Sequence, residues 1–304
     1  MVDGLIGAVE AGGTKFVVAL ADPQGAILVQ ERLPTLTADA TMPQVVDFFR
    51  RMAAAHGTIA GIGVASFGPL DIDPASPAYG TITTTPKPGW SGASFVETLA
   101  EFGVPLKIDT DVNGAALGEW RAGAGQGCRT LAYTTVGTGI GTGVTQDGRA
   151  LMGFSHYEAG HIRVPHDRTR DPFAGSCPFH GDCVEGLASG SAIAARFGRG
   201  LEAMADPAEA VALVAGYLAD MAATLVLLHA PDRLIFGGGV MKAPGMLAAL
   251  RAATVERLAG YIANPRLEGG LERYIVAPAL GDQAGITGAI LLGEQAIALR
   301  GSAA

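Results

Sequence analysis

Four side chains of types that bind zinc fall close together in the sequence. Cys177, His180 and Cys183 form the pattern Cys-x2-His-x2-Cys, and His161 precedes it. Two thiolates and two imidazoles complete a tetrahedral zinc site, and a site closed by four protein ligands is structural rather than catalytic. We therefore expect a structural Zn²⁺, against the alternative of two free thiols near loop histidines. Two more histidines of this region compete as ligands, His156 and His166.

Two carboxylates flank these predicted zinc ligands. Glu158 lies shortly before His161, and Glu185 lies shortly after Cys183. Loops fixed by zinc would hold both carboxylates rigidly, and carboxylates in such a place accept hydrogen bonds from hydroxyl groups of the kind that sugars carry. Glu158 and Glu185 are therefore candidate substrate-binding residues.

A short acidic stretch, Ile108-Asp109-Thr110-Asp111-Val112-Asn113, joins a predicted strand to a predicted helix. A carboxylate at the end of a strand can act as a general base toward a hydroxyl group, and Asp111 is our choice for that role. Aspartate and asparagine are also common helix N-caps, and Asp109 fits that simpler role.

Three glycine clusters, at residues 10–15, 136–143 and 236–241, follow or join predicted strands. Glycine lets the backbone approach a ligand closely, so the amides of the first two clusters can hold phosphate oxygens. The third cluster opens toward a helix and suits an adenine or a ribose. The simpler interpretations are a hairpin turn, a glycine-rich bulge and a strand-to-helix turn.

Neither of two better-known nucleotide motifs fits these clusters. The Walker A spacing is absent from residues 10–15. No long helix directly follows residues 136–143, which disfavours a dinucleotide-binding site.

The elements around these residues predict an α/β chain with a repeated order. Runs typical of strands lie at 4–10, 15–21, 26–32, 60–66, 105–109, 130–136, 141–146, 233–236 and 273–277. Helical spacing lies at 42–56, 93–102, 112–122, 184–198, 207–229, 244–259 and 283–299. A strand meander followed by α/β units thus occurs twice, which indicates an internal duplication. Two such halves would leave a cleft between them, a usual place for a ligand.

The bulk composition narrows the class of protein. The chain has 304 residues, which favours two domains, and its net charge of −8 argues against nucleic acid as a partner. Three cysteines make no disulfide framework. No apolar run approaches the roughly 18 residues of a membrane-spanning helix, and the N-terminus lacks the features of a signal peptide. We expect a cytoplasmic protein with no membrane partner.

These motifs, taken in order, resemble the ROK family of sugar kinases, which have a two-domain actin-like (ribonuclease H-like) fold. The resemblance extends from Gly7 to Gly288. Its most specific parts are Gly12-Gly13-Thr14-Lys15, Glu158-x-Gly160-His161, Cys183-Val184-Glu185-Gly186 and the segment from Gly281 to Ala289. We expect a small domain at 1–113 with the C-terminal helix of about 290–304, and a large domain at 114–289 with a zinc loop at 155–185.

The resemblance implies a role for each motif. Asp111 corresponds to the catalytic base, and Asn113, Glu158 and Glu185 correspond to residues at the sugar. ATP would be bound by Gly12, Gly13, Thr14, Lys15, Thr138, Gly139, Gly237, Gly238 and Gly239. Mg²⁺ would arrive with ATP, since phosphoryl transfer needs charge neutralisation. A homodimer is the family's usual state.

Several departures from the common family pattern resemble the fructokinase branch. Glu10 stands where an aspartate is common. Ser176 and Pro178 stand where two zinc-binding cysteines are common, with Cys177 and His180 in their place. Residues 85–90, Thr-Pro-Lys-Pro-Gly-Trp, are similar to that branch's loop near the sugar. Thr110 replaces the asparagine that glucokinases carry before the base, so we expect conversion of D-fructose to fructose 6-phosphate.

Three alternatives remain at this stage. The substrate could be mannose, glucose or an N-acetyl hexosamine. A sugar-binding transcriptional repressor is a different class, but the first predicted strand starts by about Leu5 and leaves no room for an N-terminal helix-turn-helix. An actin-like ATPase without a sugar substrate would leave Asp111, Glu158 and Glu185 without a purpose.

Overall fold

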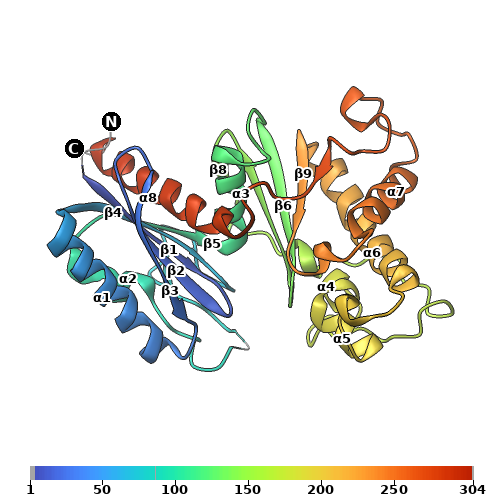
Figure 1. The fold of residues 1–304 in the computed structure, drawn as a ribbon, viewed down its shortest axis with the longest axis horizontal. Coiled ribbons are helices and arrows are strands. Elements are labelled where there is room, and N and C mark those ends of the chain that lie inside the picture. Colours follow the sequence, from blue (N-terminus) through green and yellow to red (C-terminus); the bar gives the residue numbers. More distant parts are fainter. Residues whose placement is uncertain (1–3, 86, 303–304) are drawn as a thin grey trace. The chain divides into compact units, whose positions relative to one another are not determined.

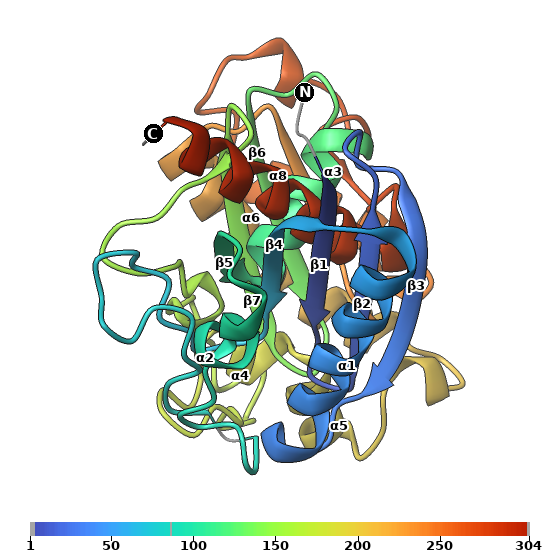
Figure 2. The same ribbon diagram turned by 90° about the vertical axis from the view of Figure 1, so that its left-hand side faces the viewer.

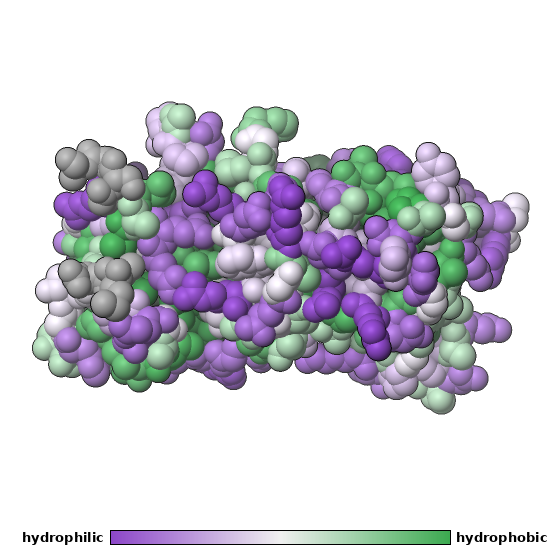
Figure 3. All heavy atoms as spheres, turned by 90° about the horizontal axis from the view of Figure 1, so that it is seen from above, coloured by the Kyte–Doolittle hydropathy of each residue, from purple (hydrophilic) through white to green (hydrophobic). Residues whose placement is uncertain are grey.

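The computed structural model describes residues 4–85 and 87–302. Met1–Asp3 of the N-terminal stretch and Pro86 of the 85–90 segment lie outside the described residues. The chain forms two units. Unit 1 comprises Met1–Gly123, Ala150–His156 and Asp282–Ala304, and unit 2 comprises Ala124–Arg149 and Tyr157–Gly281. Polar side chains cover much of the face drawn in Figure 3, with apolar ones interspersed.

Unit 1 is built on a five-stranded sheet of order β3-β2-β1-β4-β5 (Figure 1). Its strands are β1 (Leu5–Ala11), β2 (Lys15–Ala21), β3 (Ile27–Pro34), β4 (Ile59–Ser66) and β5 (Leu106–Thr110). The first three form an antiparallel meander, and β4 and β5 run parallel to β1. Strands β1, β2 and β4 are buried along most of their length, because helices cover both faces.

Helices lie on both sides of this sheet (Figure 2), and each face carries its own core. The helices are α1 (Ala38–His56), α2 (Phe95–Leu99) with a 3₁₀ turn at Ala100–Phe102, α3 (Asp111–Ala122) and α8 (Ala284–Ser302). Phe48 and Phe49 of α1 pack with Phe16 and Trp90 on one face. Leu117 of α3 packs with residues of α8 on the other.

Helices α3 and α8 meet at the level of their backbones. A Cβ on Gly288 would lie 1.8 Å from the carbonyl oxygen of Gly114, and one on Gly118 would lie 2.1 Å from that of Ala284. No side chain fits at such distances, so both positions need glycine. The helix that begins with Asp111 is therefore fixed tightly against α8.

Unit 2 repeats the strand order, as the duplication predicts. Its sheet runs β10-β9-β6-β7-β8, with β6 and β7 antiparallel and β9 and β10 parallel to β6. The strands are β6 (Thr130–Val136), β7 (Ile140–Gln146), β8 (Arg149–Ala150), β9 (Arg233–Gly237) and β10 (Ile275–Val276). The helices are α4 (Val184–Ala188), α5 (Gly190–Phe197), α6 (Ala208–His229) and α7 (Met246–Leu258). The two-sheet α/β fold predicted from the sequence is confirmed.

Two predicted elements differ from the observed ones. The predicted helix 184–198 is two helices, because Ser189 is extended and caps α5 by accepting a 3.1 Å hydrogen bond from the amide of Ala192. Helix α1 begins at Ala38, earlier than predicted, so Pro43 lies inside it.

Among the residues that the structure describes, one helix, α6, is long and apolar enough to cross a membrane, but 61% of its most apolar window is buried. Core helices of soluble proteins have the same length and composition, so this observation alone is weak support for a membrane span.

Candidate functional site

Asp111 is the first residue of α3, and the residue before it caps the helix. The hydroxyl group of Thr110 accepts a 3.2 Å hydrogen bond from the amide of Asn113. Neither Asp109 nor Asp111 is therefore the N-cap, in contrast to the simpler interpretation of Asp109. The half-buried carboxylate of Asp111 accepts a 2.9 Å bond from the amide of Val112 and carries its charge at the positive end of the helix.

Asp109 and Asn113 form a buried pair beneath this turn. The Nδ2 atom of Asn113 donates a 2.6 Å hydrogen bond to Oδ1 of Asp109, which also accepts one from the amide of Thr110. Asp109 is 5% exposed and Asn113 2%. Burial raises the pKa of Asp109, and these hydrogen bonds oppose the rise. The pair holds the first turn of α3 against the end of β5.

Glu10, at the end of β1, lies among three other charged groups of unit 1. Burial raises its pKa to about 7; Lys15 opposes the rise, and Asp111 and Asp282 add to it. The Nζ atom of Lys15 forms a 3.1 Å ion pair with Asp282. The Oε2 atom of Glu10 is buried and has no hydrogen-bond partner among the described residues. No sequence motif predicts the pairing of Lys15 with Asp282, because the two residues lie far apart in the chain.

The first glycine cluster forms a turn between β1 and β2. The amide of Gly12 donates to the carbonyl of Lys15 at 3.0 Å, and the hydroxyl of Thr35 donates to the carbonyl of Gly12 at 2.8 Å. A Cβ on Gly13 would meet no atom within 4 Å, and the φ angle of Gly13 is outside the left-handed region. Neither packing nor backbone conformation therefore requires glycine at position 13.

The second cluster joins β6 to β7 and touches one of the two predicted substrate-binding glutamates. Oε2 of Glu185 accepts a 2.9 Å hydrogen bond from the amide of Ile140. A Cβ on Gly139 would lie 2.7 Å from that oxygen, so contact with Glu185 explains the glycine. A Cβ on Gly137 would meet nothing within 4 Å, and its φ angle is not left-handed.

Packing explains two of the three glycines in the third cluster. A Cβ on Gly237 would lie 2.8 Å from the hydroxyl of Tyr133. Gly238 has a φ of +93° and approaches the backbone of Val136. A Cβ on Gly239 would meet nothing within 4 Å. In this cluster, Gly239 is therefore a glycine that contacts with the described protein atoms do not require.

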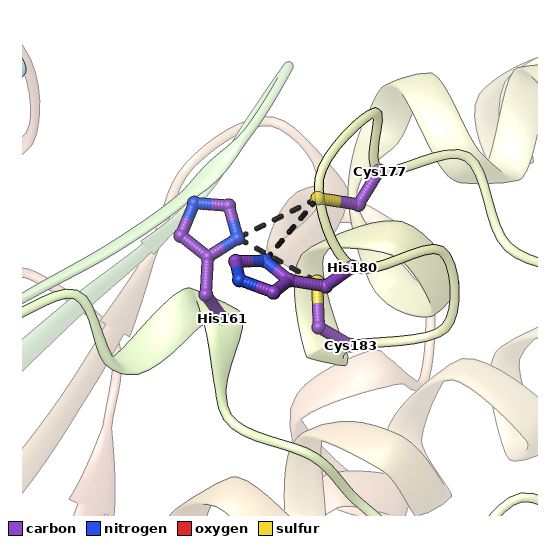
Figure 4. A group of neighbouring side chains, drawn as sticks. All are labelled: His161, Cys177, His180 and Cys183. Atoms are coloured by element: carbon purple, nitrogen blue, oxygen red, sulfur yellow. Dashed lines mark hydrogen bonds between the residues drawn. The ribbon is translucent and has the colours of Figure 1, made fainter.

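The four predicted zinc ligands converge in unit 2 (Figure 4). Their ligand atoms all lie within 4.8 Å of one another. Nδ1 of His161 is 3.7 Å from Sγ of Cys177 and 3.6 Å from Sγ of Cys183, and Nδ1 of His180 is 3.7 Å from Sγ of Cys177. Tetrahedral Zn²⁺ with ordinary bond lengths holds sulfur and nitrogen roughly 3.5 Å apart, so this donor set fits the ion. Burial raises the pKa of the Cys183 thiol to about 11.

His161 links this cluster to both glutamates. Its Nδ1 atom faces the cysteine sulfurs, and its Nε2 atom lies 4.0 Å from Oε2 of Glu158 and 3.9 Å from Oε1 of Glu185. A carboxylate near the second nitrogen of a metal-binding imidazole fixes the orientation of the ring. The Cys and His cluster and the two carboxylates therefore meet at the His161 ring.

The two competing histidines are engaged elsewhere. His166 is buried with its Nδ1 atom 3.2 Å from Asp182 and its Nε2 atom 2.9 Å from the carbonyl of Asp171. Asp171 also binds Arg196 at 2.9 Å and Tyr217 at 2.7 Å, in a network that no sequence motif indicated. His156 belongs to unit 1, where its Nε2 atom lies 3.4 Å from the amide of Leu70.

The predicted site residues divide between the two units. Unit 1 holds the first glycine cluster, Asp111 and Asn113. Unit 2 holds the other two clusters, both glutamates and the four Cys and His side chains.

Known proteins resemble this chain along its whole length. A family model described as "ROK family" matches residues 6–296. A fructokinase of Zymomonas mobilis is 48% identical over 295 residues, which cover 95% of this chain and 96% of that protein.

Two solved structures support the same likeness. A ROK hexokinase from Thermus thermophilus is 29% identical with a TM-score of 0.76, over 99% of this chain and 100% of the other. A ROK glucokinase from Streptomyces griseus, solved with glucose and AMPPNP, is 26% identical with a TM-score of 0.72, over 96% of this chain and 100% of the other.

Proposed function

The chain belongs to the ROK family and is a sugar kinase, and on that basis we propose that it converts D-fructose and ATP to fructose 6-phosphate and ADP. The observation that carries the choice of sugar is the 48% identity to a fructokinase over 95% of the chain. Thr110, in place of the asparagine that glucokinases carry, also favours fructose.

We propose Asp111 as the general base. Its carboxylate would take the proton of the accepting hydroxyl group while that oxygen bonds to the γ-phosphorus of ATP. The bond between the γ-phosphorus and the bridging oxygen breaks, and ADP leaves with the electron pair. The capping of α3 by Thr110 leaves the Asp111 carboxylate available for this role.

Glu158 and Glu185 are the proposed sugar-binding residues. Their closeness to His161 supports this proposal, because the metal cluster would hold both carboxylates where hydroxyl groups can donate to them. Asn113 is 2% exposed. We therefore propose that Asn113 acts by holding Asp109 beneath the base and not by direct contact with the sugar.

The proposed ATP-binding residues are those of the three glycine clusters. They are Gly12, Gly13, Thr14, Lys15, Thr138, Gly139, Gly237, Gly238 and Gly239. Among the glycines whose surroundings are described above, those at positions 13, 137 and 239, one from each cluster, are not required by packing or by a left-handed φ angle. An approaching nucleotide would explain all three. Mg²⁺ bound with ATP would neutralise phosphate charge during the transfer.

We further propose that His161, Cys177, His180 and Cys183 hold a structural Zn²⁺ and that the enzyme is a homodimer. The zinc would tie the turn that follows Glu158 to the loop of Cys177 and His180 and to the start of α4, the helix that carries Glu185. Its role would be to make the sugar-binding part of unit 2 rigid.

The decisive experiment is an ADP-release assay with Mg-ATP and a panel of fructose, mannose, glucose and N-acetyl hexosamines. We expect fructose to give the highest kcat/KM. A higher kcat/KM with another sugar would identify that sugar as the substrate and leave the assignment as a sugar kinase intact. No sugar-dependent release with any member of the panel would refute the proposed function.

A further inference from the structure

We propose that Lys87 is a further phosphate-binding residue, whose ammonium group contacts the phosphoryl group that the enzyme transfers. This proposal rests on the proposed function, because it assumes that the turn around Gly13 binds phosphate. It adds a cation from a segment that the nucleotide-binding clusters do not include.

The side chain of Lys87 ends at the first glycine turn. Its Nζ atom donates a hydrogen bond to the carbonyl of Gly13 and lies 5.9 Å from the centre of the Phe67 ring. Gly13 is the residue of this turn for which neither packing nor φ requires glycine. The ammonium group therefore lies next to Gly13, where the turn leaves space for a phosphate group.

The segment that carries Lys87 is anchored beside the turn. Trp90 is fully buried, with its ring centre 5.3 Å from that of Phe16 and 5.2 Å from that of Phe67. Its Nε1 atom donates a 2.6 Å hydrogen bond to the carbonyl of Leu36. Phe16 lies on β2, directly after the turn. The indole thus fixes the position of the segment, and a cation on a fixed backbone loses less entropy when it binds a ligand.

Lys87 differs from the other lysine at this turn because no carboxylate of the described residues neutralises its charge. Lys15 forms an ion pair with Asp282. Within the part of the chain that the structure describes, the ammonium group of Lys87 has no carboxylate partner, and its hydrogen bond goes to the neutral carbonyl of Gly13. An ammonium group has three N–H donors, of which this bond uses one. The remaining N–H donors of Lys87 can therefore bind a phosphoryl oxygen at this turn.

A comparison of ATP with ADP identifies which phosphate Lys87 contacts. We would measure dissociation constants of both nucleotides by calorimetry, with Mg²⁺ and without sugar, for the full-length protein and the variant Lys87→Met. We expect the ATP constant to rise on the order of 10- to 100-fold, as for a lost charged hydrogen bond, and the ADP constant to change less than about threefold. Lys87→Arg should retain most of the ATP affinity.

Arg50→Met is the matched control, because Arg50 is an exposed cation of the same unit that pairs with Glu101. It should leave both constants unchanged. Thermal unfolding of each variant shows whether the fold is intact. Equal changes for ATP and ADP, or no change for either, would overturn the proposal.

A second arm separates phosphate from sugar. Lys87→Met should weaken binding of fructose 6-phosphate and leave the affinity for fructose unchanged. A loss confined to fructose would place Lys87 at the sugar and contradict the proposal. If the protein showed no sugar-dependent turnover but Lys87→Met still weakened only ATP, the proposed function would fail while the role of Lys87 would stand.

Discussion

The carboxyl group of Glu10 lies directly against Gly285 in the first turn of α8. A Cβ on Gly285 would fall 2.5 Å from Cδ of Glu10. The end of the first strand thus meets the start of the last helix, and the side chain that makes the contact is one methylene longer than the aspartate common in the family. Glu10 fits here because Gly285, near the other end of the sequence, has no side chain.

The first prediction concerns the pH dependence of stability. The pKa of Glu10 rises from 4.5 to about 7 on folding, so the folded state binds this proton more tightly. Glu10 therefore lowers stability progressively as pH rises from about 4.5 to 7. We expect the free energy of unfolding of Glu10→Gln, relative to that of the wild type, to be about 2 kcal/mol higher at pH 8 than at pH 5, as measured by urea unfolding. Glu97→Gln, an exposed control of unit 1, should show no such gain, and an equal difference at both pH values for Glu10→Gln would contradict the prediction.

The second prediction tests the general base. Asp111→Asn keeps the shape of the side chain but cannot accept the proton, so kcat should fall roughly 10²- to 10⁴-fold. The dissociation constant of ATP should stay within about twofold, because the base acts on the hydroxyl group and not on the nucleotide. The exposed Asp39→Asn serves as control. Turnover above about a tenth of the wild-type value would remove Asp111 from this role.

The third prediction separates glycines that the fold needs from one that a ligand needs. Gly13→Ala should change stability by less than about 1 kcal/mol, since nothing lies within 4 Å of its Cβ. It should nevertheless weaken ATP binding at least about tenfold by blocking the approach of phosphate. Gly238→Ala should destabilise unit 2 severely, because its φ is +93° and the backbone of Val136 is close. Unchanged ATP binding by a folded Gly13→Ala protein would show that this turn does not hold the nucleotide.

The fourth prediction concerns the metal. Elemental analysis of protein purified without chelator should find about one Zn²⁺ per chain, and Cys183→Ser should lose it. Because both glutamates lie next to His161, metal loss should disturb them and raise the KM for sugar more than the KM for ATP. Cys128→Ser, which removes a cysteine outside the cluster, is the control. Full zinc content in Cys183→Ser would exclude this ligand set.

The sequence predicted most of the strands and the Cys and His cluster because both depend on local information. Spacing of two intervening residues brings Cys177, His180 and Cys183 together within one loop, and short runs of apolar and β-branched residues between turn signals identify strands such as β2. The break at Ser189 was missed because apolar spacing continues through it. The ion pair of Lys15 with Asp282 and the contact of Lys87 with Gly13 depend on how distant segments pack, and no spacing rule reports that.

The backbone contact between α3 and α8 has a consequence for biosynthesis. The core around β1 is closed by a helix that includes Gly288 and runs to Ser302. A ribosome makes that helix after every residue of unit 2, whose two stretches alternate in the sequence with the three segments of unit 1. Unit 1, although its synthesis starts first, therefore cannot complete its core until its last helix has been made.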